Sequence, residues 1–324
     1  MESVCDEIRR ALHESISRNR CDAILLSGGI DSSILASMAS KLNRLTGITV
    51  TRDDSPDLRY ARIIAAKYSI RHLVKSLTLE DMKDAVENVV RIMRSFDPME
   101  VRNTTVLYRS ILALKENGFG SVMTGDGGDE LFVGYKYLLR LEHGKLEDEL
   151  RKLWGMMHFS SIAIGRELGV TVRMPYLDDE FAAFAKKIPL SLKVRERDGR
   201  KCGKWILRSC FEQEITGEIA WREKMPLEQG AGTSVLTQHF DSAVGDQEFS
   251  SGAKRYALQD AVRIRDKEQM HYYEVYRKFY DAPKDVECEV RCPDCQGCVR
   301  HDSRFCSTCG AFPIRPSTEK KKRE

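Results

Sequence analysis

A turn rich in glycine and serine follows the first apolar segment of the chain. Ala23-Ile24-Leu25-Leu26 predicts a strand buried on both faces, and Ser27-Gly28-Gly29-Ile30-Asp31-Ser32-Ser33 leads from it into a helical pattern. Backbone N–H groups, hydroxyls and the positive end of a helix dipole then converge on one point, which favours an anion such as phosphate. Asp31 would repel a bare phosphate, so it predicts a magnesium ion bridging the carboxylate and the phosphates. The alternative is a tight turn in which Ser and Asp only cap the helix.

A second turn carries acidic residues among glycines. The strand candidate Ser121-Val122-Met123-Thr124 runs into Gly125-Asp126-Gly127-Gly128-Asp129-Glu130. Open α/β sheets bind their ligands at the carboxyl ends of the strands, and two such ends can share one crevice. An ordinary glycine-rich turn needs no clustered acids, whereas magnesium held between carboxylates and a triphosphate does. We therefore expect both turns to form one nucleotide site.

The cysteines are unevenly distributed, because six of the ten lie between Cys288 and Cys309. Cys292-Pro293-Asp294-Cys295 and Cys306-Ser307-Thr308-Cys309 form two CxxC knuckles, whose four thiolates can close a tetrahedron around structural zinc. Disulfides or free thiols are the alternative. Cys288 and Cys298 are spare, and one of them could substitute as a ligand. We expect the other four to be small buried residues: Cys5, Cys21, Cys202 and Cys210.

The elements around these motifs alternate between helices and strands. Helical periodicity covers Val4 to Ile16, and further helices are expected at 31–42, 56–68, 79–96, 104–116 and 251–280. A second strand is expected at Ile48 to Thr51, and a mobile loop at Gly230 to Gly252. The pattern predicts an α/β fold with a parallel sheet flanked by helices, a helical second half and a small C-terminal zinc ribbon.

Composition is that of an ordinary folded protein. The 324 residues are 42% hydrophobic and 31% charged, and 52 basic against 49 acidic residues give a formal net charge of +3. This balance favours neither attraction to nucleic acid nor repulsion from it. No apolar run is long enough for a membrane span and no signal peptide opens the sequence, so we expect a cytoplasmic protein.

The motifs taken in order resemble the synthetase domain of the asparagine synthetases, within the N-type ATP pyrophosphatase superfamily. Ser27 to Ser33 resembles the pyrophosphate loop, and Thr124 to Tyr135 resembles the second signature. The remaining motifs follow in the family's order: Ser55-Pro56-Asp57-Leu58, Arg173-Met174-Pro175-Tyr176-Leu177-Asp178, Trp205-Ile206-Leu207-Arg208 and Ala220-Trp221-Arg222-Glu223-Lys224. The resemblance implies an adenine nucleotide alpha hydrolase-like domain over 1–283. A zinc ribbon at 284–316 and a disordered basic tail at 317–324 would follow it.

By this resemblance, ATP activates a carboxylate as an acyl-adenylate, pyrophosphate leaves, and an amine displaces AMP. The nucleotide-binding residues would be Leu26, Ser27, Gly28, Gly29, Asp31, Ser32, Ser33, Gly125 and Asp129, with Leu26 at the adenine and Asp31 and Asp129 holding magnesium. Lys224 would stabilise phosphate charge, and Asp126, where the family usually has glutamate, would orient or deprotonate the amine. Arg102 would contact the substrate carboxylate. Asp97-Pro98-Met99-Glu100 stands where the family tends to have threonines, which leaves the identity of the acid open.

The resemblance begins within the first residues, so we expect no glutaminase domain before it. The resemblance therefore implies that nitrogen comes as free ammonia, from a separate glutaminase subunit, or from an amine substrate. The ribbon is expected to dock a protein, such as that glutaminase, or RNA. Two other functions stay open: an enzyme that adenylates a tRNA base for modification, and a nucleotide-binding regulatory scaffold.

Overall fold

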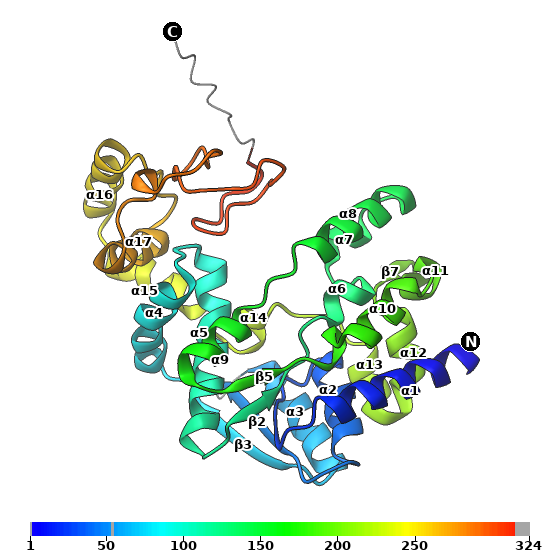
Figure 1. Ribbon diagram of the computed structural model, residues 1–324. Helices are drawn as coiled ribbons and strands as arrows, with labels where there is room; N and C mark the ends of the chain where they lie inside the picture. The colour runs from blue at the N-terminus through cyan, green and yellow to red at the C-terminus, as the bar shows by residue number, and fades with distance from the viewer. Residues whose placement is uncertain (1, 53–54, 315–324) are drawn as a thin grey trace. The chain divides into compact units, whose positions relative to one another are not determined.

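The computed structural model describes residues 2–52 and 55–314, which form two compact units (Figure 1). The first unit consists of residues up to Ser76 together with Ser110–Pro226, and the second of Leu77–Arg109 together with the residues from Leu227 onward. This division differs from the expected boundary at residue 283. The expected tail at 317–324 lies outside the described residues.

The first unit is built on a five-stranded sheet in the order β3-β2-β1-β4-β5, with every neighbouring pair parallel. The strands are β1 (Ala23–Leu25), β2 (Thr46–Thr51), β3 (Arg71–Ser76), β4 (Ser121–Met123) and β5 (Thr171–Arg173). The predicted parallel α/β sheet is thus confirmed. The two edge strands, β3 and β5, had no expected counterpart, because their side chains are mostly exposed or half-buried and give no continuous apolar run.

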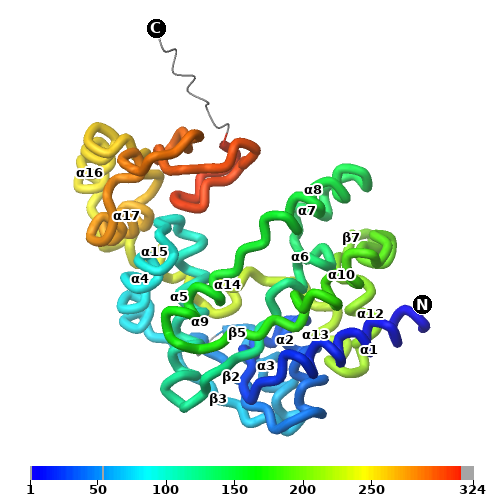
Figure 2. Tube along the Cα trace, in the orientation of Figure 1, coloured from blue at the N-terminus to red at the C-terminus, as the bar shows by residue number. Residues whose placement is uncertain are grey.

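Helices flank this sheet. They are α1 (Glu2–Arg18), α2 (Ile30–Ala39), α3 (Pro56–Lys67), α6 (Gly128–Phe132), α7 (Lys136–Leu139), α8 (His143–Gly155), α9 (Ser160–Leu168), α10 (Asp179–Lys187), α11 (Leu190–Lys193), α12 (Trp205–Ile215) and α13 (Gly217–Ala220). A short turn η1 (Pro175–Leu177) and a hairpin of β6 (Arg195–Arg197) and β7 (Arg200–Cys202) complete the unit. The trace in Figure 2 shows α12, in yellow-green, beside α1, in dark blue, although the two are far apart in sequence.

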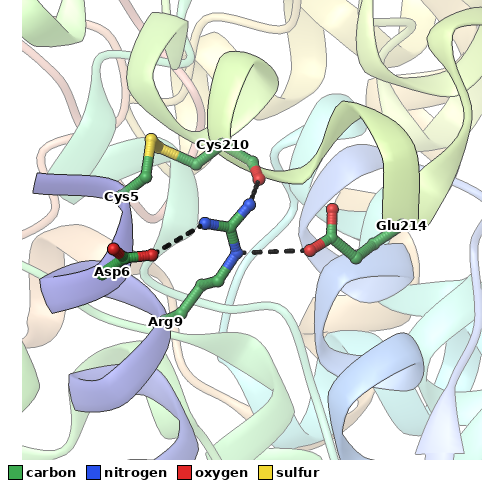
Figure 3. Close-up of a disulfide and its surroundings, with 5 residues drawn as sticks. All are labelled: Cys5, Asp6, Arg9, Cys210 and Glu214. Atoms are coloured by element: carbon green, nitrogen blue, oxygen red, sulfur yellow. Dashed lines mark hydrogen bonds and ion pairs between the residues drawn. A yellow bond between two sulfur atoms is a disulfide. The ribbon is translucent and has the colours of Figure 1, made fainter. Parts of the chain in front are cut away.

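The core of the first unit begins at α1. Ile8, Leu12 and Ile16 recur every fourth residue and are completely buried, as the periodicity predicted. Cys5 on the same face forms a disulfide with Cys210 of α12 (Figure 3). Both cysteines are buried as expected, but the disulfide between them was not expected. No spacing rule could pair two cysteines separated by 205 residues.

The second unit is helical, which confirms the helical character expected of the second half. Its helices are α4 (Leu79–Met93), α5 (Pro98–Glu116), which begins in this unit, α14 (Leu227–Gly230), α15 (Val235–Ala243), α16 (Asp246–Gln259), α17 (Lys267–Phe279) and η2 (Pro283–Asp285). The Cys-rich segment follows and belongs to the same unit. None of the helices in the described ranges is long and apolar enough to cross a membrane.

Two expectations for this unit are wrong. The segment expected as a mobile loop, Gly230 to Gly252, contains α15 and the start of α16, since Leu236 and Phe240 lie on one helical face and are buried. The single helix expected at 251–280 is broken between α16 and α17. Asp266 caps the new helix there, its side chain accepting a hydrogen bond from the Gln269 backbone N–H at 2.7 Å.

Candidate active site

The two glycine turns lie against each other at the carboxyl edge of the sheet. β1 pairs with β2 on one side and with β4 on the other, so the order of strands reverses between β1 and β4. Such a switch point is where open α/β sheets form a ligand crevice. A Cβ added at Gly128 would lie 2.4 Å from Asp31 Oδ1, so only glycine allows the second turn to approach the first so closely. The structure therefore brings together the two turns that the sequence assigned to one site.

The first turn is held by its own serines. Ser27 Oγ and Ser32 Oγ are 3.0 Å apart, and the Gly29 N–H donates to Ser27 Oγ at 3.2 Å. Gly28 adopts a φ of +70°, and Gly29 is the N-cap of α2 without any side-chain cap. Ser33 Oγ is buried and has no hydrogen-bond partner among the described residues. No side chain caps α2 at Gly29, which disfavours the interpretation of this turn as a helix cap alone.

Leu26, expected beside the adenine, is buried just before this turn. Its N–H donates to the Ile48 carbonyl at 2.8 Å, and its carbonyl accepts from Thr49 Oγ1 at 2.5 Å. Both main-chain groups of Leu26 are thus engaged within the sheet.

A lysine that the sequence analysis missed lies between the two acidic residues. Lys204 Nζ contacts Asp31 Oδ2 and lies 2.6 Å from Asp129 Oδ1, while Lys224 Nζ contacts Asp129 Oδ2. The Lys204 side chain is 2% exposed, and those of Asp31 and Asp129 are 17% and 18% exposed. Lys204 directly precedes the recognised motif at Trp205, so its place next to that motif was the available signal.

The charges in this cluster depend on one another. Burial raises the pKa of Asp129, but the ammonium groups of Lys204 and Lys224 outweigh it and lower this pKa to about 2. Burial raises the pKa of Asp31, and Lys204 offsets only part of that effect. Burial also opposes the charge on Lys204, but the two carboxylates raise its pKa overall. The result is a cluster of two aspartates and two lysines in which Lys204 is buried and Lys224 is partly exposed.

Asp126 lies behind this cluster in the second turn. Its Oδ2 accepts hydrogen bonds from Thr124 Oγ1 at 2.9 Å and from Ser161 Oγ at 2.5 Å. Burial raises the pKa of Asp126 although both hydroxyls lower it. Ser161 comes from α9, so no local sequence signal linked it to the site.

The predicted cysteine ligands form a separate, buried cluster. The sulfur atoms of Cys292, Cys295, Cys306 and Cys309 all lie within 4.8 Å of one another. The Cys292–Cys309 and Cys295–Cys306 sulfur distances are 3.8 Å and 3.7 Å. A tetrahedron with zinc–sulfur bonds of about 2.3 Å has edges of about 3.8 Å, so the arrangement fits zinc. The spare cysteines are not part of this group; Cys288 is half-buried and Cys298 is exposed.

Comparison with known proteins identifies the family of the chain. The family model described as asparagine synthase matches residues 4–168 and 163–287, most of the chain. The chain belongs to the asparagine synthase family. The four cysteines of the buried cluster lie beyond the matched residues.

Relatives within the asparagine synthase family are similar over part of their length. The glutamine-hydrolyzing asparagine synthetase B of Escherichia coli is 27% identical over 315 residues, covering 87% of this chain and 55% of the relative. The glutamine-hydrolyzing asparagine synthetase 2 of Oryza sativa is 28% identical over 286 residues, covering 81% and 48%. The chain thus spans about half the length of these curated relatives.

Among solved structures, the NMN synthetase of Francisella tularensis covers 69% of this chain and 97% of its own. The identity is 15% and the TM-score 0.32, a likeness too low to carry an argument.

Arg102, expected from the asparagine synthase resemblance to contact the substrate carboxylate, belongs to the second unit. Its Nε lies 2.6 Å from Glu228 and its NH1 lies 2.7 Å from Glu268, whose side chain is 3% exposed. Thr237 Oγ1 also accepts from Arg102, at 3.2 Å. The structure thus gives this guanidinium two internal carboxylate partners, and its role toward a substrate stays a prediction.

Magnesium, which the asparagine synthase family resemblance implies, fits the paired carboxylates. Asp31 Oδ1 is buried and has no hydrogen-bond partner among the described residues, so one acceptor in the cluster is free for a cation. Carboxylate oxygens are the ligands that magnesium prefers, and the phosphates of a nucleotide would complete its coordination.

Proposed function

We propose that the chain is an ATP-dependent carbon–nitrogen ligase that activates a carboxylate as an acyl-adenylate and then forms an amide. The observation that carries this proposal is the charged cluster of Asp31, Asp129, Lys204 and Lys224 at the point where β1 and β4 meet. Membership of the asparagine synthase family supports it.

The first step we propose joins the carboxylate to the nucleotide. A carboxylate oxygen attacks the α-phosphorus of ATP, the bond to the bridging oxygen breaks, and pyrophosphate leaves with the electron pair. The hydroxyls of Ser27, Ser32 and Ser33 and the N–H groups at the start of α2 would bind the departing phosphates. Lys224, which is 38% exposed and lies 4.8 Å over the Tyr135 ring, would neutralise charge that develops on them. Positioning and charge neutralisation supply the catalysis.

In the second step an amine attacks the carbonyl carbon of the acyl-adenylate, the carbon–oxygen bond to AMP breaks, and the amine loses a proton. Asp126 is the base that we assign to this proton. Its raised pKa makes it a better proton acceptor than an ordinary aspartate, provided that it is ionised when the amine arrives. The Thr124 and Ser161 hydroxyls fix the orientation of its carboxylate.

The metal ions have different roles in this proposal. Asp31 and Asp129 would hold magnesium, which supplies positive charge to the triphosphate. Cys292, Cys295, Cys306 and Cys309 would hold zinc in a closed, all-sulfur site, and such sites are structural.

Because the chain belongs to the asparagine synthase family, aspartate is the first carboxylate to test, with ammonia as the nitrogen donor. A separate glutaminase subunit is the partner that we propose for physiological supply, and the ribbon is its proposed docking surface.

The decisive experiment is ATP–pyrophosphate exchange with a panel of amino acids, dicarboxylates and bulk tRNA. We expect exchange that depends on a small acid, and a loss of at least about 100-fold in Lys224→Met, as when one group that stabilises transition-state charge is removed. Lys41→Met changes an exposed lysine just after α2 and should leave exchange unchanged. Exchange that depends on tRNA would instead favour base modification, and no exchange with any substrate would favour a nucleotide-binding scaffold.

A further inference from the structure

Lys204 has a position that the fold fixes tightly. It precedes α12 with a left-handed φ of 55°, and its N–H donates to the Phe132 carbonyl at 2.8 Å. A Cβ added at the preceding Gly203 would lie 1.8 Å from the Val133 carbonyl oxygen, so this approach of two backbones requires glycine. The lysine is therefore built into the interior next to the second turn, rather than being a surface side chain that reaches into the site.

The ammonium of Lys204 and a magnesium ion have the same two ligands. Lys204 Nζ contacts Asp31 and lies 2.6 Å from Asp129, the residues to which the proposed function assigns the metal. Magnesium binds oxygen at about 2.1 Å, so a metal on these carboxylates would lie within a few ångströms of the ammonium. Like charges at that distance repel strongly in a site with little water. The ammonium and the metal ion therefore cannot both stay on these two carboxylates.

Lys224 does not meet the same conflict. Its ammonium pairs with Asp129 and not with Asp31, and its side chain is 38% exposed, so it can leave the carboxylate for solvent. The Lys204 side chain is 2% exposed, so its ammonium is not in contact with bulk solvent in this position. A new anionic partner inside the site, such as a triphosphate, would let it release the aspartates without losing its charge partner.

We propose that Lys204 competes with magnesium for the carboxylates of Asp31 and Asp129. Lys204 releases these carboxylates to the metal only when the phosphates of a nucleotide bind its ammonium instead. This inference rests on the proposed function, because it takes the metal and the nucleotide from there. It means that divalent metal alone binds weakly, and that metal and nucleotide bind with positive coupling, each raising the affinity for the other.

Manganese binding without nucleotide tests this competition directly. Electron paramagnetic resonance of Mn²⁺ titrated into the full chain should show at least about tenfold tighter binding to Lys204→Met than to the wild type, because the competing charge is gone. Lys204→Arg keeps the charge and should bind as weakly as the wild type. Adding Asp31→Asn to Lys204→Met should remove the gained site, which locates it, and Lys41→Met should match the wild type. Equal affinities of folded Lys204→Met and wild type, judged by circular dichroism, would overturn the proposal.

A second measurement uses the wild type alone, so that a folding defect in a variant cannot hide the answer. At fixed free Mn²⁺, binding to the protein should rise at least about tenfold with α,β-methylene-ATP, with the metal held by the nucleotide alone subtracted. Binding that is lost in Asp31→Asn but is equally tight with and without nucleotide would contradict the competition. Exchange activity is read separately. If the protein catalyses exchange but manganese binding does not tighten, only the proposed competition is contradicted. If manganese binding tightens but no exchange occurs, only the proposed ligase activity is contradicted.

Discussion

Cys5 of α1 is bonded to Cys210 of α12, the helix that begins immediately after Lys204. Arg9 reinforces the connection, because its guanidinium donates to the Cys210 carbonyl and lies 3.2 Å from Glu214 (Figure 3). The disulfide thus connects α1 to the helix that directly follows Lys204 of the proposed nucleotide site.

Reducing this disulfide should destabilise the first unit. A cross-link between residues 205 apart restricts the unfolded chain, and loops of 100 residues or more correspond to about 5 kcal/mol in the chain-entropy account, an upper value. Cys210→Ser should therefore lower the urea midpoint, and dithiothreitol should lower that of the wild type but not of the variant. Cys202→Ser, at a half-buried free cysteine, is the control. Thiol titration of the wild type, denatured without reductant and free of metal, should find eight thiols. Ten thiols would show that the disulfide is absent.

Arg102→Met should destabilise the second unit by about 3–5 kcal/mol, because it leaves Glu268 and Glu228 buried without their charge partner. Urea unfolding measures this, and Arg10→Met, at an exposed arginine of α1, should change stability by less than about 0.5 kcal/mol. If Arg102→Met instead keeps its stability and raises only KM for the acid, the guanidinium serves the substrate and not the fold.

Lys193→Met should stabilise the protein near neutral pH. Lys193 is 2% exposed, lies 5.2 Å over the Trp154 ring, and has no carboxylate partner in the described parts of the chain. Burial lowers its pKa to about 8 from an ordinary value near 10.5, so the folded state resists its charge. The wild type should therefore gain stability as pH rises from about 8 to about 10.5, and the advantage of the variant, a few kcal/mol at pH 7, should shrink over that window. Melting temperatures of both proteins across pH 7–10.5 measure it, and a constant difference would refute it.

Removing metal from the cysteine cluster should destabilise the second unit and not only the cysteine-rich segment. The Thr308 carbonyl accepts from the Phe96 N–H at 2.8 Å, and the Cys309 carbonyl accepts from Gln269 Nε2 at 2.8 Å, so the second knuckle is bonded to the segment before α5 and to α17. We expect one zinc per chain by elemental analysis and a lower melting temperature after chelation or in Cys306→Ser. Cys298→Ser, outside the cluster, should retain both zinc and stability. An unchanged melting temperature in the metal-free protein would show that the ribbon is an independent accessory.

The sequence was most informative where one local pattern determines one local structure. The apolar run before Ser27 and the period of four along α1 predicted a buried strand and an amphipathic helix, and both are present. The two CxxC knuckles likewise lie together, since a tetrahedral site needs only four correctly spaced sulfurs.

What the sequence did not reveal depends on residues that meet only after folding. Lys204 reaches Asp31 across 173 residues, and Ser161 of α9 reaches Asp126 across 35 residues, so no short window of the sequence contains either pair. The same reason explains why the cysteine cluster was expected to be a separate domain. Its hydrogen bonds to Ser95 and Phe96 join segments more than 200 residues apart.

The order in which the two units occupy the chain affects how the protein can be made. The apolar face of α4, formed by Met82, Val86 and Val89, packs against α17, which is translated only after Ser110–Pro226. This apolar face therefore stays uncovered by α17 while the whole of Ser110–Pro226 is translated and folds. During synthesis, this face of α4 is a surface that we expect a chaperone to bind.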